Sequence, residues 1–186
     1  MVRLRLGGSA DCNAPAACFG LAMSQQTAAA RYRIVMTFFI AALVASGLTA
    51  FPLLHELRLL SSLLGIDSAA SYEQLTGLRH WIAFVHTGLE VTYARFPFIG
   101  YGTDWLAFGH LVIALFFIEP LRRPGTCQGN LVVGMIACAA IVPLALVCGG
   151  IRGIPLHWRL IDCSFGVFGI MPLVVCWRIG RRLGAG

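Results

Sequence analysis

Four long apolar stretches constrain this fold more than any other feature, because segments of this length and apolarity belong in a lipid bilayer. They run over residues 34–51, 105–119, 131–149 and 160–177. A bilayer core about 30 Å thick needs about 20 apolar residues per helix, with about 17 as the lower limit. The second stretch is too short unless residues 98–103 enter the membrane or the helix continues to Leu121. With that extension, the pattern predicts four transmembrane helices.

The composition supports the same class. Of the 186 residues, 58% are hydrophobic and only 12% are charged, whereas soluble domains average about 45–50% apolar and about 25% charged residues. We therefore expect an all-α, polytopic membrane protein in which residues 23–186 form one compact four-helix bundle. Only residues 52–103 are long enough to form structure outside the bilayer.

Residues 1–22 do not resemble the start of a membrane domain. They lack the continuous apolar core of about 7 to 15 residues that a signal peptide requires. Met23, followed by the polar run Ser-Gln-Gln-Thr, has the features of an ordinary translation start. We expect residues 1–22 to be a disordered leader or the product of a mis-assigned start codon.

The arginines predict an orientation. The net charge of +6 comes from 14 arginines, because the chain has no lysine. Three groups would share one membrane side if the spans alternate: Arg31 and Arg33; Arg122 and Arg123; Arg178, Arg181 and Arg182. Cytoplasmic loops collect such residues, so we expect both termini in the cytoplasm. Since the arginines flank apolar spans, the lipid bilayer is the expected partner, and nucleic acid is not.

The segment between the first two spans reads as extracytoplasmic and helical. Residues 53–64 are rich in leucine and end at Gly65, and residues 72–96 repeat apolar residues at helical spacing. The second of these helices is amphipathic. It either covers the bundle or lies in the membrane interface, and a partly inserted fifth helix is the alternative.

Ionisable residues gather near the predicted outer ends of the spans. His110 lies six residues beyond Asp104, about 9 Å deeper at the rise of an α-helix. Ionisable groups in a bilayer tend to face the bundle interior, so we expect an outward-facing polar cavity with His110 near its floor. Its candidate ligand-binding residues are Asp104, His110, Arg152, His157, Arg159 and Asp162.

These residues admit four interpretations. In a structural one, Arg152 and Arg159 neutralise Asp104 and Asp162. In a metal site, His86 and Glu90 share a helix face, with His80 nearby. In a haem site, His110 pairs with His157 or His55. In a proton-handling site, Asp162 and His110 exchange protons.

Several local features have simpler structural roles. Thr103 or Asp104 is placed to cap the second span. Glu119 can pair with Arg122 or Arg123 three and four residues on. Small residues allow close helix contacts in the first and fourth spans, namely Ala42, Ser46, Ala50, Gly166 and Gly169. Nucleophilic catalysis lacks support, because the sequence has no GxSxG, HExxH or Walker motif.

Three runs carry a family resemblance: YGTDWLAFGH at 101–110, IRGIP at 151–155 and WRLIDCSFG at 158–166. They resemble an uncharacterised bacterial family of short four-helix integral membrane proteins, over residues 23–182. The resemblance implies a bacterial integral membrane protein and no catalytic activity.

The expected function is a non-enzymatic module of the bacterial inner membrane. It would be an accessory subunit of a membrane complex, with other membrane subunits as partners, or would bind a small or lipophilic ligand in the polar cavity. One alternative is a haem- or metal-dependent redox component that uses His110 with His86, Glu90 or His157. A second alternative is a proton-coupled carrier of small solutes.

Overall fold

The computed structural model describes residues 14–66 and 72–184, with side chains from Met23 onward. Every regular element in this part of the chain is helical. The long helices are α1 (Ala14–Ala50), α4 (Gly100–Phe116), α6 (Gln128–Ile151) and α7 (Leu156–Leu183). Shorter elements connect them: α2 (Leu53–Leu63), η1 (Tyr72–Gln74), α3 (Gly77–Arg95), η2 (Pro97–Ile99) and α5 (Ile118–Arg122). Residues 1–22 were expected to be a disordered leader, but α1 already begins at Ala14, so residues 14–22 are helical. Residues 1–13 lie outside the described residues.

Four helical segments are long and apolar enough to cross a membrane: Met23–Ala50, Pro97–Arg122, Gln128–Ile151 and Leu156–Leu183. This agrees with the predicted multi-pass membrane protein. The second segment reaches sufficient length in both of the expected ways, because η2 precedes α4 and α5 follows it.

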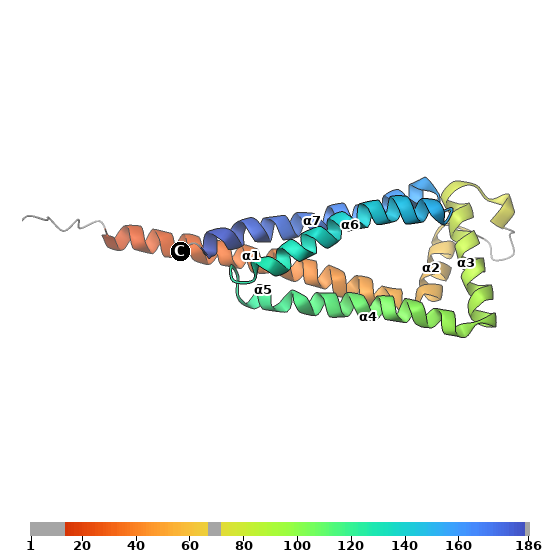
Figure 1. The fold of residues 1–186 in the computed structure, drawn as a ribbon, viewed down its shortest axis with the longest axis horizontal. Helices are drawn as coiled ribbons and strands as arrows, with labels where there is room; N and C mark the ends of the chain where they lie inside the picture. The colour runs from red at the N-terminus through yellow and green to blue at the C-terminus, as the bar shows by residue number, and fades with distance from the viewer. Residues whose placement is uncertain (1–13, 67–71, 185–186) are drawn as a thin grey trace, which may run out of the picture.

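The spans form two pairs that meet at one end and diverge toward the other (Figure 1). Helix α1 packs along α4, α6 packs along α7, and α1 also contacts α7. The pairs converge near α5 and the C-terminus and separate toward α2 and α3. The prediction of a compact bundle therefore holds only for the converging end, where large side chains from both pairs interlock.

The core marks this converging end. Its buried residues are Tyr32, Met36, Phe39, Phe117, Leu131, Leu173 and Cys176, drawn from all four spans. The rings of Phe39 and Phe117 meet edge to face with centroids 5.0 Å apart. The Cys176 thiol donates a hydrogen bond to the backbone oxygen of Tyr32 at 3.7 Å. These contacts join α1 to the junction of α4 and α5 and to α7.

Glycines set the spacing within each pair. A Cβ on Gly166 would collide with the Cys138 carbonyl oxygen across the α6–α7 contact. This agrees with the prediction that Gly166 allows a close helix contact. In the α1–α4 contact, a Cβ on Gly47 would lie 2.9 Å from the Ala107 carbonyl oxygen. The sequence pattern indicated close helix contacts at Ala42, Ser46 and Ala50, and of these Ala42 and Ser46 line a cavity.

Helices α2 and α3 lie across the diverging ends of the spans (Figure 1). Arg58 of α2 pairs with Glu90 of α3 at 2.8 Å. The leucine-rich helix ends before Gly65, as predicted. Helix α3 begins at Gly77 and not at residue 72, because Thr76 has an extended backbone and Gly77 has φ +59°, which only glycine adopts readily.

Candidate functional site

The structure does not gather the six predicted ligand-binding residues into one polar cavity. Asp104 and His110 line different cavities. Arg152 and His157 are exposed, and Asp162 is partly buried. The physical reason is the divergence of the helix pairs, because Asp104 and His110 belong to the α1–α4 pair whereas the other four belong to α7 or to the turn that joins α6 to it.

The expected ion pairs of Asp104 and Asp162 with Arg152 and Arg159 are not formed in the described part of the chain, where Arg58 pairs with Glu90 and Arg123 pairs with Glu119. The second confirms the predicted pairing of Glu119, with Arg123 Nε 3.1 Å from the carboxylate.

Arg159 has a different role. Its side chain packs over Gly149 and Gly150, and its Nη1 donates a hydrogen bond to the backbone oxygen of Leu146 at 3.2 Å. A cation at the carbonyl end of a helix is favourable. Arg159 thus fastens the start of α7 to the end of α6, and the Gly149–Gly150 pair is the sequence signal for this contact.

The predicted cap at Asp104 is also wrong. Helix α4 begins at Gly100, so Asp104 is the fifth residue of the helix and lies beyond the capping position. The Thr103 hydroxyl donates to the Gly100 backbone oxygen at 2.7 Å. The carboxylate of Asp104 makes no hydrogen bond or ion pair to another described residue. Asp104 is therefore available to a ligand.

The candidate metal ligands have other partners. Glu90 is paired with Arg58, and His80 Nδ1 lies 2.7 Å from the backbone oxygen of Tyr72. His86 Nε2 is buried without a hydrogen-bond partner among the described residues. Within residues 14–66 and 72–184, no three His, Cys, Asp or Glu side chains are grouped to hold a metal ion. This arrangement does not support the predicted metal site.

The histidines predicted to bind haem lie at different depths. His110 lies at the level of residues 165–172 of α7, with which it lines one cavity. His157 is in the first turn of α7, at least eight residues earlier and therefore about 12 Å away along the helix axis. His55 is exposed on α2. The geometry therefore does not support an axial pair that includes His110.

A central cavity of about 370 Å³ lies between the two helix pairs, at the middle of the spans. Its walls come from all four transmembrane segments: Phe38, Phe39, Ala42, Leu43, Ser46, His110, Cys138, Ile141, Phe165, Phe168, Gly169 and Pro172. Most of these side chains are apolar. The small side chains of Ala42 and Ser46 leave space here, although the sequence pattern predicted close helix contacts at these positions. At Gly169 a close contact is present, because an added Cβ would lie 3.1 Å from Cys138 Sγ.

His110 lines the central cavity and has one ring nitrogen without a hydrogen-bond partner among the described residues. Its Nδ1 lies 2.8 Å from the backbone oxygen of Leu106. A carbonyl oxygen only accepts hydrogen bonds, so Nδ1 carries the proton and donates it. In a neutral imidazole, Nε2 is then the acceptor, and it has no partner among the described residues. His110 can thus accept a hydrogen bond from a ligand.

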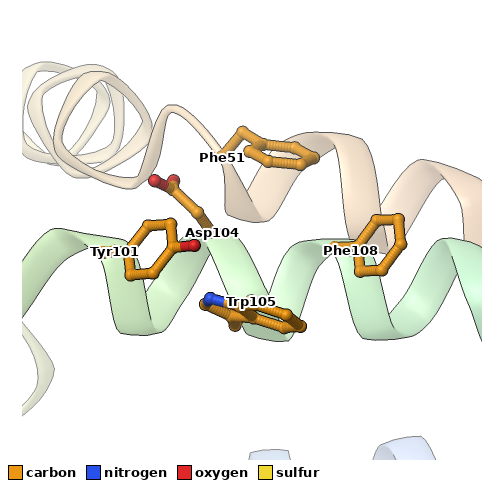
Figure 2. A pocket seen from close by; sticks show the side chains of 5 residues that line it. All are labelled: Phe51, Tyr101, Asp104, Trp105 and Phe108. Carbon is orange, nitrogen blue, oxygen red and sulfur yellow. The ribbon is translucent and has the colours of Figure 1, made fainter.

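A second, shallower pocket of about 320 Å³ lies at the diverging end of the α1–α4 pair. Phe51, which directly follows α1, lines it together with Tyr101, Asp104, Trp105 and Phe108 of α4 (Figure 2). We call this the Asp104 pocket. Its α4 residues are three or four apart and so share one helix face. Three aromatic residues and an aspartate at this spacing were the sequence signal for it.

Comparisons with known proteins do not assign the chain to a family. No protein-family model, no curated protein and no solved structure matches the chain. The resemblance of the runs at 101–110, 151–155 and 158–166 to a bacterial membrane family stays a prediction. The geometry of the two cavities is therefore the basis for a functional assignment.

Proposed function

We propose that this protein is a non-enzymatic binding module of the bacterial inner membrane that holds a lipophilic ligand in the central cavity. The supporting observation is a cavity at mid-span whose walls come from all four transmembrane segments. Ligand sites are typically concave and mostly apolar, with few polar groups and volumes of about 300–1,000 Å³. The central cavity agrees with each of these properties.

The unpaired acceptor of His110 narrows the ligand class. An unpaired acceptor in the middle of a bilayer is unfavourable, because lipid tails supply no donor. Nε2 of His110 would gain a partner from a ligand with a hydroxyl group. The proposed ligand is therefore a long apolar molecule with a single hydrogen-bond donor, such as a lipid alcohol.

We further propose that both termini face the cytoplasm. The exposed arginines Arg31, Arg33, Arg122, Arg123 and Arg178 belong to parts of α1, α5 and α7 near the converging end. Arginine-rich ends face the cytoplasm in membrane proteins. Helices α2 and α3 would then lie on the outer side. We expect a fluorescent protein fused to the C-terminus to fluoresce, and alkaline phosphatase at the same place to be inactive. The reverse result would contradict this orientation.

The binding proposal predicts that filling the central cavity abolishes ligand binding. In Ala42→Phe, a ring would occupy the space beside Phe38 and Ser46. We expect the purified full-length variant to lose saturable binding of a fluorescent polyene fatty alcohol, measured by its fluorescence increase. Ala41→Phe is the matched control, because Ala41 is exposed and is not among the cavity residues. Equal binding by both variants, or no saturable binding by the wild type, would contradict the proposal.

The role of His110 is tested with the methyl ether of the same probe, which lacks the donor. One hydrogen bond is worth about 1 kcal/mol, or about fivefold in affinity. The wild type should prefer the alcohol by about this factor, and His110→Phe should bind both probes alike. If the wild type binds both equally, the cavity is a lipophilic site without the proposed hydroxyl recognition.

A further inference from the structure

We propose that the Asp104 pocket binds an organic ammonium group, such as the trimethylammonium of choline or the headgroup of a lipid that carries one. This site is separate from the central cavity and does not depend on the function proposed for it. Its chemistry comes from Phe51, Tyr101, Asp104, Trp105 and Phe108, which line one pocket.

The aromatic residues make the pocket attractive to cations. The rings of Tyr101 and Trp105 have centroids 6.0 Å apart, and those of Trp105 and Phe108 are 6.1 Å apart, each pair nearly perpendicular. Phe51 lies across from them at the end of α1 (Figure 2). The face of an aromatic ring carries negative charge density and attracts a cation within about 6 Å, most strongly at Trp.

The carboxylate of Asp104 adds a full negative charge beside these rings. Figure 2 shows it extending from α4 toward the end of α1, near the rings of Phe51 and Tyr101. No described residue supplies a compensating charge: Asp104 has no ion pair, and the arginines seen over rings lie on Phe96 and Trp177. A carboxylate partly removed from water and without a partner favours a cation from outside the chain.

The same residues favour an organic cation over a metal ion. Calcium takes six to eight oxygen ligands and magnesium six, whereas this pocket offers one carboxylate, and the described residues contain no metal-binding group of three. An ammonium with methyl or alkyl substituents matches both the carboxylate and the aromatic rings, because its charge can pair with the carboxylate and its carbons can contact the rings.

The position of the pocket fits an ammonium at the membrane surface. Tyr101 and Trp105 belong to the first turns of α4, at one end of a candidate span. Tyr and Trp at span ends lie at the level of lipid headgroups. The four rings are between 43% and 62% exposed, so a ligand reaches them without opening the fold.

The test uses the full-length protein labelled with fluorotryptophan in nanodiscs of phosphatidylglycerol, a lipid without ammonium. The chain has four tryptophans, and Trp105→Phe assigns the Trp105 resonance in the fluorine NMR spectrum. Choline chloride should shift this resonance saturably. The carbon isostere of choline, in which a tert-butyl group replaces trimethylammonium, should leave it unchanged at equal concentration.

Asp104→Asn should weaken choline binding by about tenfold or more while preserving side-chain shape. Asp162→Asn is the matched control, since Asp162 lies on α7 outside the pocket. Nanodiscs that contain phosphatidylcholine distinguish the two sources of the ammonium group. If the ligand is a lipid headgroup, they should shift the Trp105 resonance without added choline. If the ligand is a free cation, the resonance should still respond to added choline. An equal response to the isostere, unchanged affinity in Asp104→Asn, or no response to choline or phosphatidylcholine would overturn the proposal.

Discussion

Gly166→Ala is expected to lower the free energy of unfolding by about 1–3 kcal/mol, the usual cost of overpacking a close contact. The added methyl group would collide with the backbone oxygen of Cys138. A backbone atom cannot turn away as a flexible side chain does, so α6 and α7 must move apart. The change is measured by reversible denaturation of the purified protein in mixed micelles.

Gly109→Ala is the matched control for this prediction. Gly109 lies within α4, and a Cβ there would meet no atom within 4 Å. Alanine is favoured over glycine inside helices by about 0.5–1 kcal/mol, so this variant should be as stable as the wild type or slightly more stable. If both variants are destabilised equally, the α6–α7 contact at Gly166 is not as close as described.

Leu173→Ala is expected to destabilise the converging end by about 2 kcal/mol, the low end of the range for buried leucines. Leu173 is fully buried in the core that joins both helix pairs. In a membrane protein, the transfer of apolar surface from water contributes little to helix association, because lipid is as apolar as leucine. The loss then arises from the packing contacts that the cavity removes.

Leu144→Ala separates this packing effect from a general effect of shortening a leucine. Leu144 lies on α6 and is 61% exposed, so lipid replaces the lost contacts. Its free energy of unfolding should stay within about 0.5 kcal/mol of the wild type. A loss at Leu144 as large as that at Leu173 would show that the converging end does not hold the stabilising core.

The position of Leu173 also bears on the central cavity. Pro172 lines the cavity, and Leu173 is its neighbour in the core at the converging end. Phe39 belongs to both groups. The central cavity therefore adjoins the core and begins where that packing stops.

Much of the fold was predictable from the sequence. The apolar stretches, Gly65 and the small residue Gly166 indicated four spans, the end of the leucine-rich helix and the α6–α7 contact. These features depend on segment length, local backbone conformation and side-chain size, each of which is read along the chain. The start of α3 was misplaced because apolar periodicity continues through Gly77, while the backbone at Thr76 and Gly77 does not continue the helix.

The candidate site was less predictable. The sequence analysis grouped Asp104 with Asp162 and Arg159 by their positions along the spans, because all three lie near the predicted outer ends. Depth does not specify lateral position. Only the tertiary structure shows that the pairs separate at this end, which leaves Asp104 with the rings of its own helix and Phe51, and places Arg159 on the end of α6.

The sequence by itself determined that the chain has four segments long and apolar enough to cross a membrane, because that property depends only on the length and composition of each segment. The tertiary structure decided which helices pair, where the pairs diverge and which residues line each cavity. Those outcomes depend on how side chains of particular shapes pack between distant segments, as Phe39 does against Phe117, and no pattern along one helix specifies such a fit.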